Sequence, residues 1–215
     1  MIPQTNSPAA KRPPSGLRAC AACAAELAGQ RPAVLIDTDP QGSLAAWWNV
    51  RKAETPAFAS ANVADLVNKL RDLETAGFSL AFVDTPPAIA QAISAVIAQV
   101  DLVLIPTRPS PHDLRAVGST VGLVQEQGKP FAFVLTQAKP NTRLTVQAMA
   151  ALSAHGAVAP AVIHDRIDYA ASMIDGRTVQ DTEPNSRGAA EVGELWGFVQ
   201  QRLHDSTKAR RRGAA

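Results

Sequence analysis

The chain has 215 residues and a mass of 22.6 kDa, enough for one domain with a sizeable core. Its hydrophobic fraction of 46%, charged fraction of 19% and formal net charge of +2 are those of an ordinary globular protein. No apolar run approaches the roughly 18 residues that cross a bilayer, and the start MIPQTNSPAAKRPP lacks the apolar core of a secretory signal. We therefore expect a cytoplasmic protein with no membrane partner.

From residue 33 onward, short apolar runs alternate with stretches of helical periodicity. The runs predict strands at residues 33–39, 80–87, 101–109, 131–137 and 159–164. Between and after them we predict helices at residues 42–54, 63–77, 88–99, 110–128, 143–156 and 189–203. Because the strands are apolar throughout and helices separate them, the pattern predicts an α/β fold. This fold is a doubly wound, mostly parallel sheet with helices on both faces.

Acidic side chains stand where two of these strands end. Asp37 and Asp39 close the first run, and Asp84 closes the second. In parallel sheets, ligands bind outside the carboxyl ends of the strands. One such acid is explained by capping of the next helix. Three acids on two strands favour a metal site, because buried carboxylates are costly without a cation or a water network.

Both cysteines lie close together, as Cys20 and Cys23 in C-A-A-C. This spacing also occurs in redox motifs and zinc sites. Zinc would need two further ligands, and the four histidines begin only at His112. We therefore interpret the two cysteines as small residues on a helix face.

The chain ends in the basic stretch KARRRGAA. We predict that residues 205–215 form a flexible tail. The sequence leaves open whether this tail is simply solvated or makes weak contacts with nucleic acid phosphates.

Five segments in register resemble one known family. VLIDTDPQGSLAAWW, LAFVDTPP, VDLVLIPTRPSPHDLRAV, VLTQAKPNTRL and IHDRIDYAASMIDGRTVQDTEPNSRGAAEVGELW are similar to motifs of the ParA/MinD-type partition ATPases. These are P-loop NTPases with a deviant Walker A motif. The order and spacing agree over residues 33–204, which we interpret as a ParA-like nucleotide-binding domain.

The resemblance implies specific roles for residues of this chain. Asp84 would hold Mg²⁺ through a water molecule, and Asp37 would help to hold it. Asp37 would also position the water that attacks the phosphate, and Asp39 would orient the loop. The segment that lies near the adenine would supply Pro140, Asn141 and Arg143.

The resemblance also implies cofactors and partners. Family members bind ATP and Mg²⁺ between two subunits, and this homodimer binds nonspecific DNA. A centromere-binding partner protein then stimulates hydrolysis during plasmid or chromosome partition. Such a protein would be nucleoid-associated if DNA binding is retained.

Residues 1–32 depart from the family. There the family has a strand and a Gly-rich loop of the form K-G-G-x-G-K-T-T, which cradles the phosphates. This chain has SPAAKRPPSG, in which Lys11 is the only possible relic, and MIPQTN is too short and polar for a buried central strand. We predict a poorly ordered segment followed by a first helix, without a recognisable Walker A loop.

Three explanations for this departure stay open. The chain could be a degenerate, non-hydrolysing paralogue that acts as a binding module. It could carry an N-terminus read in another frame, since the codons of residues 9–13, read two bases later, permit Gly-Lys-Thr-Thr. It could also have gained a new loop unrelated to nucleotide. A metabolic relative such as a cobyrinic acid amidating synthetase is disfavoured, because no glutaminase-type nucleophile with a triad is present.

Overall fold

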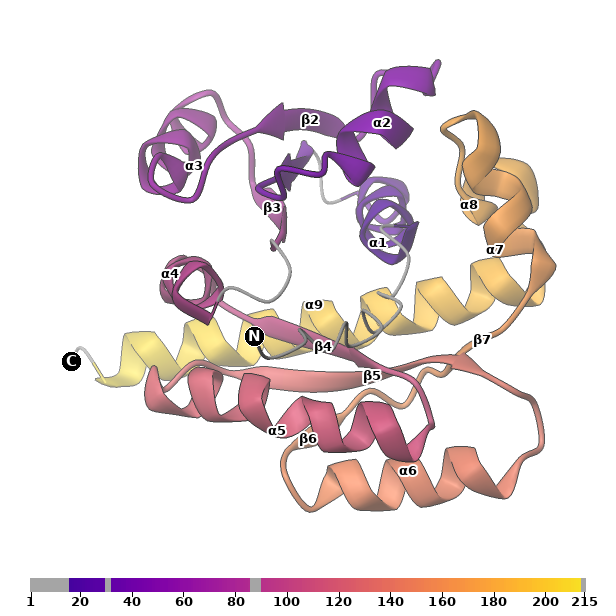
Figure 1. Cartoon of the computed structure of the whole chain (residues 1–215). Coiled ribbons are helices and arrows are strands. Elements are labelled where there is room, and N and C mark those ends of the chain that lie inside the picture. Colours follow the sequence, from indigo (N-terminus) through magenta and orange to yellow (C-terminus); the bar gives the residue numbers. More distant parts are fainter. Residues whose placement is uncertain (1–15, 30–31, 86–89, 214–215) are drawn as a thin grey trace, which may run out of the picture.

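The computed structural model of the chain describes residues 16–29, 32–85 and 90–213 (Figure 1). Lys11 lies outside the described residues. Strands and helices alternate along the chain. In chain order the elements are α1 (Gly16–Leu27), β1 (Ala33–Asp37), α2 (Ser43–Val50), β2 (Ala57–Ser60), α3 (Leu66–Thr75), β3 (Leu80–Asp84), α4 (Ala90–Gln99), β4 (Val103–Thr107), α5 (Pro111–Glu126), β5 (Phe131–Ala138), α6 (Arg143–Ser153), β6 (Ala157–Val158), β7 (Ile163–His164), α7 (Ile167–Ser172), the 3₁₀ helix η1 (Met173–Asp175), α8 (Val179–Thr182) and α9 (Arg187–Gly213).

All strand pairs among the described residues are parallel. They form two sheets, one in the order β2-β1-β3 and the other in the order β4-β5-β6, with β7 also pairing with β5. Figure 1 shows the two sheets one above the other, with β3 and β4 as the strands that lie nearest to each other. The predicted α/β architecture is confirmed, and among the described strands β3 and β4 are not hydrogen-bonded to each other.

Helices cover both faces of the sheets, as predicted. On one face, α1, α2 and α9 pack against inward side chains such as Leu35 of β1 and Val134 of β5. On the other face, α3, α4, α5 and α6 cover Ile36 of β1 and Phe133 of β5. Consecutive residues of one strand therefore enter opposite cores, as the two-residue period of a strand requires.

Several element boundaries differ from the sequence-based prediction. The strand β2 was not predicted, because AFAS is short and carries only one large apolar residue. The predicted strand at 159–164 is wrong as a single unit, since β6 and β7 lie on either side of residues 159–162. α5 begins as predicted: Ser110 caps the helix by accepting a hydrogen bond from the Asp113 N–H.

The last helix does not end at residue 203 as predicted. α9 continues to Gly213, through the segment expected to be a flexible tail. Residues 204–212 contain neither glycine nor proline, so nothing in the chain stops the helix before Gly213. No helix of the described chain is long and apolar enough to span a membrane.

A carboxylate on α9 fixes the end of β7 and the start of α7. Glu191 accepts hydrogen bonds from the His164 N–H and ring, from the Arg166 guanidinium and from the Tyr169 hydroxyl. Burial alone would raise the pKa of Glu191, but these donors outweigh it and lower the pKa. The segment from residue 164 to residue 169 is thus anchored to the helix layer.

Candidate functional site

The predicted acids meet at the carboxyl ends of two neighbouring strands. Asp37 of β1 and Asp84 of β3 are register partners in the parallel ladder. The loop after β1 is tied to β3, since the Thr38 N–H and hydroxyl both donate to the Asp84 carbonyl oxygen. Asp39 follows in the same loop, and all three acids are buried. The sequence therefore predicted correctly which carboxylates share this sheet end.

Asp37 and Asp39 accept backbone hydrogen bonds that fix the turn after β1 and the start of α2. Asp37 accepts a 3.0 Å hydrogen bond on each carboxylate oxygen, one from the Asp39 N–H and one from the Ala45 N–H in the first turn of α2. Asp39 in turn accepts a hydrogen bond from the Gln41 N–H. These contacts satisfy free amides of the turn and of the helix start, where a negative charge is favourable.

Asp84 is paired with an arginine of the first helix. The Arg18 guanidinium lies 2.9 Å from an Asp84 carboxylate oxygen, and the side chains are 27% and 11% exposed. Burial raises the pKa of Asp84, the Arg18 charge opposes that effect, and the nearby Asp37 and Asp39 charges add to it, so that the net shift is upward. Arg18 was missed from the sequence, because no local motif links residue 18 to a strand that ends at residue 84.

This arrangement does not fit a magnesium ion as the residues lie. Within the described parts of the chain, no three His, Cys, Asp or Glu side chains are placed to hold a metal. Magnesium needs oxygen ligands that are free to accept it or its waters. Here Arg18 pairs with Asp84, and each oxygen of Asp37 already accepts one backbone amide.

The residues predicted to lie near the adenine are on the other sheet. Pro140, Asn141 and Arg143 follow β5 and are all exposed. Asn141 has a positive φ of 57°, a conformation that asparagine tolerates in turns. Their predicted role in nucleotide binding stays a prediction, and a turn before α6 accounts for the asparagine.

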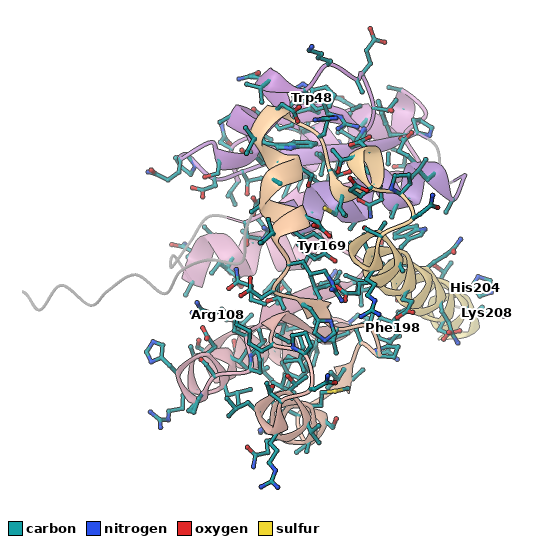
Figure 2. The ribbon with its side chains drawn as sticks, turned by 90° about the vertical axis from the view of Figure 1, so that its right-hand side faces the viewer. Trp48, Arg108, Tyr169, Phe198, His204 and Lys208 are labelled. Carbon is teal, nitrogen blue, oxygen red and sulfur yellow. The ribbon has the colours of Figure 1, made fainter. Side chains whose placement is uncertain are left out.

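A pocket of about 300 Å³ lies beside this turn, at the carboxyl ends of β4 and β5. The Arg108 guanidinium on its wall binds Asp113 through two hydrogen bonds of 2.9 and 3.0 Å. Figure 2 shows Arg108 at this end of the lower sheet. The three residues predicted to lie near the adenine are not in its lining. The lining residues are Arg108, Pro109, Ser110, His112, Asp113, Gln137, Lys139, Thr142 and Leu144.

The two cysteines are buried in α1 as free thiols. Burial raises the pKa of Cys20 to about 12 and that of Cys23 to about 11, so neither is a thiolate near neutral pH. Cys20 packs in the core beneath α9, and the Cys23 sulfur accepts a long hydrogen bond from Arg51. Both act as small packing residues.

The sequence comparisons match most of the chain. A family model described as VirC1 protein matches residues 15–178. Protein virC1 of Rhizobium rhizogenes is 31% identical over 163 residues, which span 69% of this chain and 70% of that protein. Maintenance of carboxysome distribution protein A of Gloeobacter kilaueensis is 38% identical over 123 residues, which span 55% of this chain. The chain covers only 56% of the length of that relative.

The structural comparisons support the same fold. The MinC:MinD cell division protein complex of Aquifex aeolicus aligns with a TM-score of 0.71 at 12% identity, covering 86% of this chain and 90% of that one. The septum site-determining protein MinD of Pyrococcus horikoshii, complexed with Mg-ADP, aligns with a TM-score of 0.69 at 13% identity. This second match covers 89% of this chain and 93% of that one. At such identities the likeness shows the fold alone.

Proposed function

Because the chain belongs to the VirC1 family, within the ParA/MinD-type partition ATPases, we propose that it is a partition protein that binds DNA and a partner without hydrolysing ATP. Relatives of this type include carboxysome-distribution, ParA and VirC1 proteins, so partition of a plasmid or chromosome is one member of a wider set of positioning tasks. The proposed task for this chain is to bind DNA, either as the molecule that is positioned or as the surface along which positioning takes place. A centromere-binding protein is the proposed partner.

The ion pair between Arg18 and Asp84 carries this proposal. The resemblance assigns the acid at this strand end to water-mediated binding of Mg²⁺, and here the guanidinium supplies the positive charge from within the chain. The sequence also has no glycine-rich loop of the type that wraps phosphates. A site with an internal cation and no phosphate loop supports a binding module better than it supports an ATP-switched homodimer.

We expect the purified chain to show no saturable rise in mant-ATP fluorescence on titration, with or without excess Mg²⁺. We also expect no release of phosphate from ATP. An Asp84→Asn variant serves as the matched control, because it removes the carboxylate charge with little change in volume. The variant and the parent should give the same flat titration.

A Mg²⁺-dependent titration in the parent that disappears in Asp84→Asn would contradict the proposal. It would mean that Asp84 exchanges Arg18 for a metal when nucleotide is present. ATP-dependent dimerisation, measured by sedimentation velocity, would contradict the proposal in the same way. Either result would mean that this chain is a homodimer controlled by ATP, as the family resemblance implies.

The proposed DNA contact is the basic end of α9. Lys208 is exposed, and Arg210, Arg211 and Arg212 follow in the same helix. Figure 2 shows His204 and Lys208 projecting from α9 on the side away from the β4–β5 sheet. Lysine and arginine that neutralise phosphates release counterions, and this makes binding depend on salt.

We expect fluorescence anisotropy to detect binding of a labelled duplex of arbitrary sequence without nucleotide. A variant in which Lys208, Arg210, Arg211 and Arg212 become alanine should lose most of that affinity. If all four contact phosphates, the slope of log K against log salt should become less steep by about 3–4. An Arg71→Ala variant on α3 is the control for loss of a single exposed charge. Unchanged affinity in the fourfold variant would exclude this helix end as the contact.

A further inference from the structure

The pocket at the carboxyl ends of β4 and β5 brings together the starts of two helices. Its volume is about 300 Å³. Its lining includes Ser110 and Asp113 from the start of α5, and Thr142 and Leu144 from the start of α6. Figure 1 shows both helices beginning at the end of the sheet where β4 and β5 finish. A helix N-terminus presents backbone N–H groups and a partial positive charge, so two of them at one pocket favour an anion there.

The two helix starts are capped differently within the described chain. At α5, Ser110 accepts a hydrogen bond from the Asp113 N–H, and Asp113 places an acid in the first turn. At α6, Thr142 makes no side-chain capping bond, and the first turn holds no acid. The first residue of α6 is instead Arg143, although a negative charge is the favourable one at this helix end. The N–H groups of the first turn of α6 are therefore donors that a ligand in the pocket can use.

The side chains of the lining add one cation that is open to a ligand. Arg108 donates two hydrogen bonds to Asp113, so these two charges balance each other. Lys139 remains, and its partner Asp165 is not among the described lining residues. The Lys139 and Asp165 side chains are 70% and 50% exposed, and ion pairs between exposed side chains are weak. Because the lysine ammonium has three N–H donors, it can bind a ligand and keep Asp165.

The donors and the size of the pocket restrict the class of ligand. The three terminal oxygens of a phosphate monoester can accept from the first-turn amides of α6 and from Lys139, whereas a carboxylate has only two oxygens. A cavity of roughly 150 Å³ holds benzene, so this pocket has room for a phosphate with a few carbon atoms. Pro109 and Leu144 are apolar lining residues that would contact the carbon part. We propose that the pocket binds a compact phosphate monoester, with its phosphate at the N-terminus of α6 and at Lys139.

This site is independent of the proposed loss of ATP hydrolysis. It uses neither the ion pair between Arg18 and Asp84 nor the other acids at the ends of β1 and β3. Its volume also lies at the lower end of the range for ligand pockets, which favours a ligand smaller than a nucleoside triphosphate. The site would therefore give the chain a small-molecule ligand besides the proposed DNA and protein partners.

Titration of the full chain with glycerol 3-phosphate, followed by amide NMR, tests the proposal. The amide signals of residues 143–145 should shift until saturation, with a dissociation constant below about 1 mM at low salt. Glycerol lacks the anion and should cause no shift, and acetate should bind at least about tenfold more weakly. Inorganic phosphate should also bind more weakly, because it lacks the carbon part. Equal affinity for acetate or for inorganic phosphate would overturn the assignment to a phosphate monoester.

A Thr142→Asp variant separates binding from folding. Aspartate at this position would accept hydrogen bonds from the first-turn N–H groups of α6 and so take the place of the ligand. Its thermal midpoint should be at least that of the parent, whereas its affinity for glycerol 3-phosphate should fall at least about tenfold. Lys139→Gln should also weaken binding. Arg71→Gln removes an exposed charge from α3 and is the control, with unchanged affinity.

Three outcomes would overturn the proposal. The first is a shift of the amide signals that does not saturate with glycerol 3-phosphate. The second is binding of this ester to Thr142→Asp as tightly as to the parent. The third is an equal loss of affinity in Lys139→Gln and Arg71→Gln, since the charge of the whole chain and not the pocket would then attract the phosphate. This last comparison decides the matter even if Thr142→Asp fails to fold.

Discussion

Replacing Arg51 by alanine is expected to lower the free energy of unfolding by about 2–3 kcal/mol, less than the loss for a fully buried ion pair because the Asp181 side chain is 30% exposed. Arg51 follows α2, and its side chain is only 3% exposed. It binds both carboxylate oxygens of Asp181, at 2.8 and 3.2 Å, from a position 130 residues away in the chain. Removal of the guanidinium leaves the half-buried Asp181 charge without its partner.

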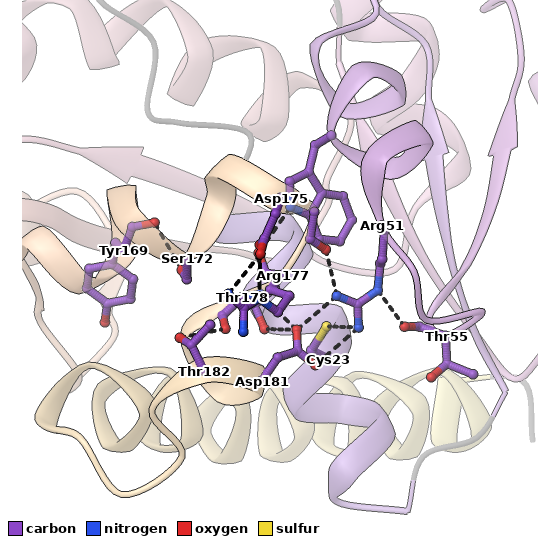
Figure 3. A network of polar contacts seen from close by, with 12 residues as sticks. Cys23, Arg51, Thr55, Tyr169, Ser172, Asp175, Arg177, Thr178, Asp181 and Thr182 are labelled. Carbon is purple, nitrogen blue, oxygen red and sulfur yellow. Dashed lines mark hydrogen bonds and ion pairs between the residues drawn. The ribbon is translucent and has the colours of Figure 1, made fainter.

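The remaining contacts of Arg51 explain why no nearby side chain can replace it. Its guanidinium also donates to the carbonyl oxygens of Thr55 and Gly176 at 2.8 Å, and lies 5.3 Å from the ring centroid of Trp47. Figure 3 shows these bonds converging from α1, α2 and the segment that leads into α8. A single planar group with several donors therefore joins three parts of the chain.

Urea unfolding of the parent and of Arg51→Ala measures the loss. Arg177→Ala is the matched control, because Arg177 also pairs with an acid, Asp175, but both side chains are about half exposed. We expect that control to cost far less stability than Arg51→Ala, because an exposed ion pair contributes little. Similar losses in the two variants would show that the Arg51 pair is no stronger than an ordinary surface ion pair.

Substitution of Gly176 by alanine is expected to destabilise the fold by about 2–4 kcal/mol. Gly176 has a φ of +76°, a conformation that side chains disfavour. A Cβ atom there would lie 2.3 Å from the backbone nitrogen of Arg51 and 2.4 Å from its Cα. Because the neighbouring atoms are backbone, they cannot turn aside as the end of a side chain would.

The same unfolding measurement on Gly193→Ala is the control. It shows whether any glycine-to-alanine change lowers stability or only one at which the backbones lie close together. Gly193 lies within α9, and an added Cβ would meet nothing within 4 Å. Alanine should therefore stabilise the helix there by about 0.5–1 kcal/mol. If Gly176→Ala is as stable as the parent, the contact between this turn and Arg51 does not restrict residue 176.

Both substitutions concern a feature that local sequence patterns do not reveal. Asp181 takes part in a capping box with Thr178, which has a short-range signature. Its pairing with Arg51 spans 130 residues and has none. The ion pair between Arg18 and Asp84 and the ring contact between Phe82 and Trp196 also lack a short-range sequence signature. These contacts depend on which helix covers which strand, and the chain forms that arrangement only as a whole.

The sequence by itself determined the α/β class, the parallel strands and the position of Asp37, Asp39 and Asp84 at the strand ends. It could do so because apolar periodicity and strand-end residues are local properties of a chain. The tertiary structure decided that Arg18 pairs with Asp84 and that, among the described strands, β3 and β4 are not paired with each other. Ion pairs and strand neighbours are set by packing between segments that are distant in the sequence. Several strands or helices have similar apolar patterns, so the pattern alone does not say which of them become neighbours.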